Sequence, residues 1–237
     1  MAGRLVVAVG SLVLIGFLSG TAHASQFVVV EADGPDLAPG QTVDGAKPFS
    51  LEDGQAATLL SAGGQIIKLE GPYNAAPDSA MKRTDSTNMQ EAMNALISER
   101  KARTSEVGLV RGKEDTLPDP WVVDVTNPGT SCIEAGKPVV LWRTAPLTET
   151  SVIFTPKDQS WKVSGKWPAA ADRIALPATM PLRDNTDYVV ALGERLAPVT
   201  VRLIPATVNN DVMRASYMIE MGCDSQVNAL VAIWQKK

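Results

Sequence analysis

The sequence predicts a mostly β, α+β fold: a small β region, a helical connector, and an antiparallel β-sandwich with a C-terminal two-helix tail. Three observations support this prediction. Short β-branched and aromatic runs are bounded by proline and glycine, which is typical of strands and turns. A glycine-containing turn separates two such runs in the N-terminal half. Near the C-terminus the apolar residues recur with the spacing of a helix.

The first β region is expected over residues 25–73. Phe27–Val30 is a β-branched and aromatic run. Ala57–Leu60 and Ile66–Leu69 flank the segment Ser61–Gly64. Because that segment carries the glycines of a tight turn, we expect the two runs to form a hairpin.

Residues 74–120 have a different, more polar character and form the predicted connector. Met89, Met93, Leu96 and Ile97 fall on one face of a helix. An amphipathic helix usually buries its apolar face, so we expect this one to pack on a sheet. The alternative is a protruding helix that binds a partner.

Residues 121–237 contain short strands at even spacing, which favours an antiparallel sandwich. The expected strands are Trp121–Val125, Pro138–Arg143, Ser151–Phe154, Ser160–Val163, Arg173–Leu176, Tyr188–Leu192 and Val199–Ile204.

Two helices are expected after the last strand. Asn210 is positioned to cap the first helix and Gly222 to end it. Asp224 is positioned to cap the second helix. Cys223 lies at the junction between the two.

The N-terminus has the three-part pattern of a secretory signal. Arg4 supplies a positive charge, Leu5–Leu18 is an apolar core, and Ala22-His23-Ala24 has small residues where a signal peptidase cuts. We therefore expect residues 1–24 to be removed by cleavage between Ala24 and Ser25. The alternative is a retained anchor, but the apolar core is about 14 residues long and a membrane span needs roughly 20. The mature chain is expected to be periplasmic or secreted, without insertion into the membrane.

The composition argues against several kinds of function. His23 is the only histidine, and it lies in the signal. The mature chain would thus lack histidine-based catalysis and histidine-ligated zinc. The formal net charge is −4, which disfavours nucleic acid as a partner. We expect no catalytic residue, no cofactor and no metal ligand.

Cys132 and Cys223 are the only cysteines. Two cysteines in an exported chain usually form a disulfide, so we expect them to be bonded. Two free buried thiols are the alternative.

One N-terminal stretch carries a family resemblance in three parts: Leu37–Gln41, Phe49–Leu60 and Gly63–Tyr73. These motifs of turns and short strands resemble the FecR-like domain of bacterial periplasmic proteins. FecR proteins also have a membrane anchor and a cytoplasmic anti-sigma segment. Because this chain shows neither, the resemblance implies a fold and not the regulatory role.

A second resemblance lies in Leu182–Val190, where a polar turn leads to Tyr188 and alternating apolar residues. This is similar to the penultimate strand of fibronectin-type and immunoglobulin-like sandwiches, and it implies that the Tyr188 hydroxyl bonds to nearby backbone. The spacing of Cys132 and Trp142 also resembles immunoglobulin domains, although Val190 stands where their second cysteine is expected. The whole chain resembles a family of bacterial exported proteins for which the resemblance implies no activity.

Three patterns suggest chemistry, each with a structural alternative. Trp161 and Trp167 flank Gly165 and could stack against a ligand such as a sugar, or pack in the core. Asp184–Asp187 could offer oxygens to calcium, or form a connecting turn. Ser79–Lys82 has the Ser-x-x-Lys spacing of penicillin-binding enzymes, but the other motifs of those enzymes are missing.

These features predict an exported, periplasmic, non-catalytic accessory or binding module for a protein partner or a component of the cell envelope. One alternative is a histidine-independent glycan hydrolase that uses carboxylates. Another is a structural subunit of an exported assembly, in which Gln26–Glu31 pairs with a free sheet edge of another subunit.

Overall fold

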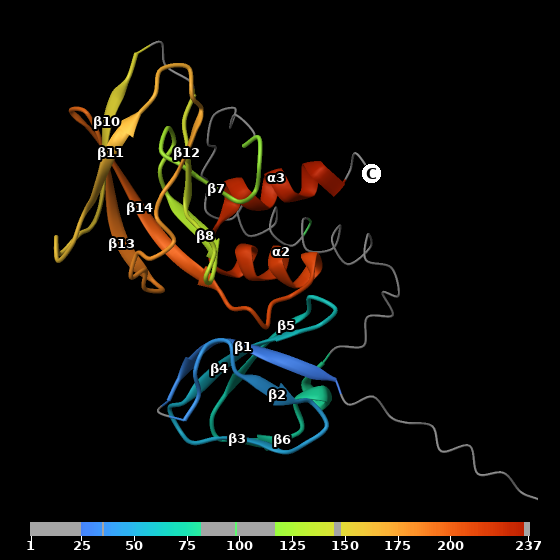
Figure 1. The fold of residues 1–237 in the computed structure, drawn as a ribbon. Coiled ribbons are helices and arrows are strands. Elements are labelled where there is room, and N and C mark those ends of the chain that lie inside the picture. The colour runs from blue at the N-terminus through green and yellow to red at the C-terminus, as the bar shows by residue number, and fades with distance from the viewer. Residues whose placement is uncertain (1–24, 35, 82–97, 99–116, 145–147, 235–237) are drawn as a thin grey trace, which may run out of the picture.

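The computed structural model describes residues 25–34, 36–81, 98, 117–144 and 148–234. It shows a small β unit, a β-sandwich and a pair of C-terminal helices, with helix α2 lying between the two β parts (Figure 1). The predicted signal (1–24) and the predicted helix around Met89–Ile97 lie outside the described residues. The mostly β fold with two C-terminal helices is confirmed.

The N-terminal unit contains a four-stranded antiparallel sheet in the order β2-β1-β4-β5, beside a two-stranded sheet of β3 and β6. The hairpin predicted around Ser61–Gly64 is confirmed, because β4 and β5 pair across it. The elements are β1 (Gln26–Asp33), β2 (Thr42–Asp44), β3 (Phe49–Leu51), β4 (Ala56–Ser61), β5 (Ile66–Glu70), β6 (Tyr73–Ala75) and the 3-10 helix η1 (Pro77–Ala80).

Strand β1 lies between two hydrophobic cores. Phe27 and Val29 join the core inside the N-terminal unit, and Val28 and Val30 join the core that contains the C-terminal helices. β1 also pairs with β2 on one side and β4 on the other. Gln26–Val28 pair with β2, and the strand pairs with β4 as far as Asp33. These partners within its own sheet contradict the hypothesis that Gln26–Glu31 pairs with an edge of another subunit.

The sandwich consists of a five-stranded sheet, β11-β10-β13-β14-β8, and a three-stranded sheet, β12-β9-β7. An antiparallel sandwich was predicted. The structure differs in two pairs of neighbouring strands, β14 with β8 and β7 with β9, which are parallel. Its strands are β7 (Val122–Asp124), β8 (Thr130–Glu134), β9 (Val140–Trp142), β10 (Thr150–Pro156), β11 (Val163–Trp167), β12 (Arg173–Ala175), β13 (Thr186–Leu192) and β14 (Arg195–Ile204).

Two strand predictions in the sandwich need correction. The strand predicted over Ser160–Val163 is displaced, because its residues are largely a loop and the strand runs over Val163–Trp167. Strand β8 was not predicted, since Thr130–Glu134 has few apolar residues. The Tyr188 prediction is confirmed: the Arg183 backbone N–H donates a 2.9 Å hydrogen bond to the Tyr188 hydroxyl.

The two C-terminal helices are α2 (Asp211–Glu220) and α3 (Asp224–Trp234). The Asn210 side chain caps α2 as predicted, accepting a hydrogen bond from the Met213 N–H. Gly222, with φ +75°, follows the end of α2. Asp224 differs slightly from the prediction because it is the first residue of α3 and does not precede the helix.

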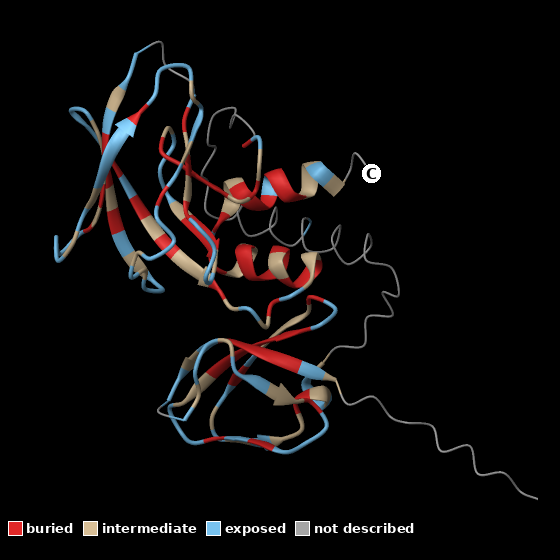
Figure 2. Cartoon of the chain, viewed as in Figure 1, coloured by how far each residue is buried: buried red, intermediate tan, exposed pale blue. Residues whose placement is uncertain are grey.

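Helix α2 is buried on opposite sides. Figure 2 shows buried residues along α2 and on the strands that it faces. Tyr217 and Met218 of α2 share one hydrophobic core with Val30 and Leu60 of the N-terminal sheet. A Cβ on Gly64, at the tip of the β4–β5 turn, would collide with the Val212 side chain of α2, so the turn lies directly against the helix.

Candidate functional site: a polar groove beside an exposed sheet face

A groove of about 390 Å³ opens between the N-terminal sheet and the sandwich. Its N-terminal wall comes from β1, β4 and β5, and its other wall from β14 and the turn before β13. The residues that define its charge are Glu31, Asp33, Lys68, Glu70, Asp184 and Arg202.

A β-bulge in β1 shapes the N-terminal wall. The pairing of β1 with β4 shifts register between Val29 and Glu31, which leaves Val30 as the extra residue. A bulge bends its strand and re-aims the side chains that follow. Here Glu31 and Asp33 follow the bulge and line the groove.

The sheet register places two carboxylates across a small floor. Ala56 of β4 pairs with Asp33 of β1 on one side and with Glu70 of β5 on the other. Residues directly opposite one another lie on the same face of a sheet. Asp33 and Glu70 therefore flank the Ala56 methyl group, with backbones two strand spacings or ~10 Å apart.

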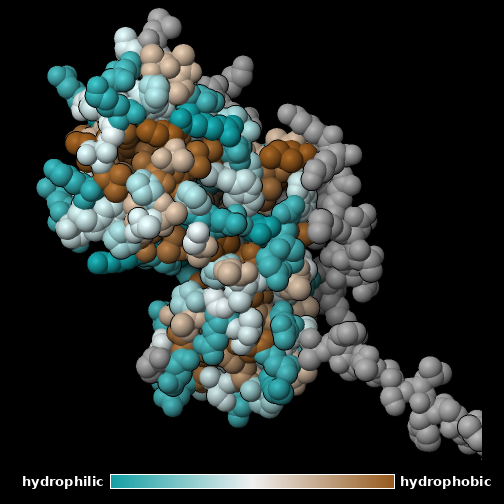
Figure 3. All heavy atoms as spheres, viewed as in Figure 1, coloured by the Kyte–Doolittle hydropathy of each residue, from teal (hydrophilic) through white to brown (hydrophobic). Residues whose placement is uncertain are grey.

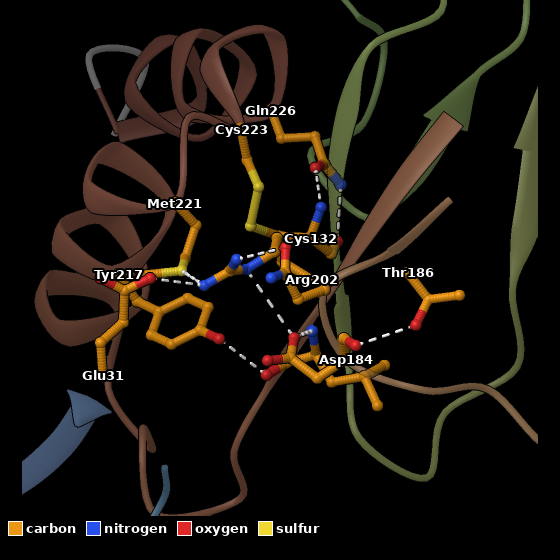
Figure 4. A network of polar contacts seen from close by, with 11 residues as sticks. Glu31, Cys132, Asp184, Thr186, Arg202, Tyr217, Met221, Cys223 and Gln226 are labelled. Atoms are coloured by element: carbon orange, nitrogen blue, oxygen red, sulfur yellow. Dashed lines mark hydrogen bonds and ion pairs between the residues drawn. A yellow bond between two sulfur atoms is a disulfide. The ribbon is translucent and has the colours of Figure 1, made fainter. Parts of the chain in front are cut away.

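Arg202 connects the two walls (Figure 4). Its Nη2 lies 2.8 Å from Glu31 Oε1 in the N-terminal sheet, and its Nη1 lies 2.7 Å from Asn185 Oδ1 in the sandwich. Its Nε lies 3.8 Å from Asp184 Oδ1, and its guanidinium also contacts the Met221 sulfur. The Arg202 side chain is 13% exposed, so these contacts are partly shielded from water.

The second cation of the groove is also paired. Lys68 Nζ lies 2.5 Å from Glu220 Oε1 on α2. Among the described residues, Asp33 and Glu70 have neither a hydrogen bond nor an ion pair from their side chains. Arg202 and Lys68 thus have carboxylate partners, whereas Asp33 and Glu70 have none within the described ranges.

Tyr217 supports the sandwich wall from behind. Its hydroxyl donates a 2.8 Å hydrogen bond to the Leu203 carbonyl, next to Arg202. Burial raises the pKa of Tyr217, and the nearby Asp184 charge raises this pKa further. The neutral phenol is therefore the form that the fold favours.

Replacing Tyr217 by phenylalanine should remove the part of the loss of stability at high pH that is due to Tyr217. Because folding raises the Tyr217 pKa, its contribution is complete below the unfolded-state pKa near ~10 and declines as the pH rises above that value. Tyr217→Phe should cost about 1 kcal/mol at neutral pH, for one hydrogen bond. Urea unfolding measured from pH 7 to pH 11 should show that the difference in the free energy of unfolding between wild type and variant becomes smaller as the pH rises. If the difference in the free energy of unfolding stays constant across that range, the conclusion that folding raises the Tyr217 pKa is contradicted.

Behind the groove, Cys132 of β8 and Cys223 form a disulfide, as predicted. Both cysteines are buried. Gln226 of α3 lies beside the bond, where its side chain accepts from the Cys132 N–H at 2.6 Å and donates to the Cys132 carbonyl at 2.8 Å. Its amide also donates to the Pro120 carbonyl at 2.8 Å. The helical tail is thus fixed to β8 both covalently and by hydrogen bonds.

The outer face of the five-stranded sheet continues away from the groove. In register, Ile153 of β10 lies opposite Ala191 of β13, which lies opposite Leu196 of β14. Val189 and Pro198 form the next row on the same face. Leu196 is 66% exposed, more than any other large hydrophobic side chain among the residues that the structure describes. We call these five residues the apolar row. In one view of the whole molecule, hydrophobic residues, coloured brown, reach the surface of the sandwich at several places (Figure 3).

The structure does not bring Trp161 and Trp167 together as a stacking surface. Trp167 is completely buried, its indole N–H donates to the Ala171 carbonyl, and Arg143 covers its ring at 4.3 Å. The ligand-stacking hypothesis for Trp167 is therefore wrong. Trp161 is half-buried and packs on Tyr188. Gly165 and Trp167 lie in β11, and Trp161 lies in the loop before this strand, so the two tryptophans occupy different elements.

The other sequence patterns have structural roles where they are described. Asp184 accepts a 2.7 Å hydrogen bond from the Leu203 N–H, and Asp187 accepts one from the Thr200 hydroxyl, as expected for a turn that joins strands. Ser79 donates its hydroxyl to the Ala76 carbonyl, and Lys82 lies outside the described residues. Within the described ranges, no group of three or more histidine, cysteine or acidic side chains is arranged to hold a metal.

No protein-family model matches this chain, and no curated protein matches it either. The FecR-like and immunoglobulin-like resemblances therefore stay predictions. In the described part of the chain, no helix has the length and hydrophobicity needed to cross a membrane.

Sequence reasoning did not identify Arg202, Asp33 or Glu70. A signal for Arg202 was present, since it is the single charge within the apolar run Val199–Ile204. No comparable signal marks Asp33 and Glu70, because their proximity depends on the register of three strands.

Proposed function

We propose that this protein is an exported, non-catalytic binding module that uses its sheets as a scaffold for a protein partner or a component of the cell envelope. Export is supported by the signal pattern of residues 1–24 and by the disulfide, since disulfides persist in oxidising compartments. The periplasm is the expected location.

The observation that carries the proposal is the apolar row on the sandwich. Successive side chains along the strands of this sheet point to opposite faces, and Val152, Phe154 and Val190 point into the core of the sandwich. The side chains between them form a second apolar surface that is partly or fully exposed. Exposed apolar surface with polar surroundings is typical of protein interaction sites. Lys166 with Glu149, and Lys157 with Asp187, provide such a polar surrounding.

The groove favours binding over the alternative of a carboxylate-based hydrolase. Glu31 and Asp184 contact the same Arg202 guanidinium, so both carboxylates already take part in the contacts that join the two walls. Asp33 and Glu70 lie on the exposed surface of the sheet. General acid catalysis usually requires a carboxyl group in an apolar or like-charged setting that favours its protonated form.

A crosslinking experiment tests the proposal. The full chain, exported with an affinity tag, would be crosslinked reversibly in the envelope fraction, and captured proteins identified by mass spectrometry. We expect a partner at near-stoichiometric yield, reduced at least about tenfold by Leu196→Glu because burying a new charge is costly. Ile233→Glu is the matched control, since Ile233 is the other exposed large hydrophobic residue in the described part of the chain and lies on α3. Equal capture by the two variants, or no partner for wild type, would contradict the proposal.

A further inference from the structure

The groove and the apolar row form one continuous surface along β14. Leu196, Pro198, Thr200 and Arg202 alternate with residues that face the core of the sandwich, so all four lie on the outer side of the sheet. Leu196 belongs to the apolar row and Arg202 to the wall of the groove. Arg202 comes six positions after Leu196 in the strand, which corresponds to ~20 Å.

The two ends of this surface have different chemistry. At one end, Asp33 and Glu70 are the carboxylates without partners among the described residues, while Arg202 and Lys68 are ion-paired. At the other end, the exposed side chains are apolar. A ligand that satisfies both ends needs a positive group and, some distance away, apolar groups.

From this geometry we infer that the surface binds a peptide segment of a partner protein, with a lysine or arginine side chain in the groove and apolar side chains on the apolar row. The inference rests on the proposed function and specifies the partner. The groove, at about 390 Å³, has room for a long basic side chain. The methyl group of Ala56 on its floor leaves the space between Asp33 and Glu70 open to the aliphatic part of that side chain.

Two other occupants fit less well. Asp33 and Glu70 supply two carboxylates, whereas a divalent cation such as Ca²⁺ takes about six to eight oxygen ligands. The apolar row spans three strands and two rows of residues. The apolar row has five residues, whereas each side of a stable interface has about 20–30, so a second copy is not favoured.

Synthetic peptides can test this inference on the folded protein. The first peptide carries one lysine, a four-residue Gly-Ser spacer and the sequence Leu-Thr-Val, with both ends blocked. The second has glutamate in place of the lysine, and the third has serines in place of leucine and valine. Each would be titrated into ¹⁵N-labelled protein and followed through backbone amide shifts.

We expect saturable shifts with the lysine peptide at two places, around Ala56 and Glu70 and around Ala191 and Leu196. The glutamate peptide should bind about tenfold more weakly, because it loses two carboxylate contacts and meets repulsion. The double variant Asp33→Asn, Glu70→Gln should bind the lysine and glutamate peptides with similar affinity. Leu196→Glu should weaken the binding of the lysine peptide and leave the binding of the serine peptide unchanged.

Some results would overturn the inference. One is the absence of saturable shifts up to millimolar peptide; another is equal affinity for the lysine and glutamate peptides. The envelope capture separates this failure from failure of the proposed function. A partner lost with Leu196→Glu but retained by the Asp33→Asn, Glu70→Gln variant would sustain the function and refute the basic-peptide inference.

Discussion

Removing the Cys132–Cys223 disulfide, by replacing both cysteines with alanine, should lower the free energy of unfolding by ~4–5 kcal/mol. The bond joins residues 91 apart in sequence. Without it the unfolded chain regains the conformational freedom of a loop of that size, which stabilises the unfolded state. Equilibrium unfolding in urea measures the change.

Reductant provides the control for this prediction. Treating the wild type with reductant under unfolding conditions should bring its stability close to that of the double variant, and the variant itself should not respond. A loss below about 2 kcal/mol would contradict the prediction, and would mean that the unfolded chain is already compact between Cys132 and Cys223.

Replacing Gln226 by leucine should cost ~3 kcal/mol or more, because it leaves three buried backbone groups without partners. Those groups are the N–H and the carbonyl of Cys132 and the carbonyl of Pro120. Leucine has nearly the volume of glutamine, so the change removes hydrogen bonds with little loss of packing. Thermal and urea unfolding both report this loss.

Gln55→Leu is a matched control for Gln226→Leu. Within the described residues the Gln55 side chain makes one hydrogen bond, accepted from the Glu52 N–H near the surface, so its loss should cost under about 1 kcal/mol. If the two variants lose equal stability, water has replaced the Gln226 amide, and the account of its role is wrong.

Local pattern was enough to predict several elements. The Ser61–Gly64 turn, the Asn210 cap and the alternation around Tyr188 depend on neighbouring residues, and the structure confirms each of them. Strand β8 shows the limit of local pattern. Thr130–Glu134 has little strand character of its own, and it becomes a strand because β14 offers a parallel edge beside the disulfide.

The candidate site depended on contacts between distant segments, which explains why the sequence did not reveal it. Glu31 and Arg202 are far apart in the chain, and Asp33 and Glu70 face the same groove only through the register of β1, β4 and β5. The ligand-stacking prediction for the two tryptophans failed because it considered residue type and spacing without the burial of Trp167. A short loop and a strand place Trp167 in the core of the sandwich, which the residue type alone does not reveal.

The position of α2 between the two β parts has a consequence for the order of events during synthesis. Val28, Val30 and Leu60 of the N-terminal sheet belong to the same hydrophobic core as residues of α2 and α3, which leave the ribosome much later. Until those helices emerge, one side of β1 has no native neighbour to cover its apolar side chains. A nascent chain that stops after β14 would therefore be a good client for a holding chaperone and an easy substrate for proteases.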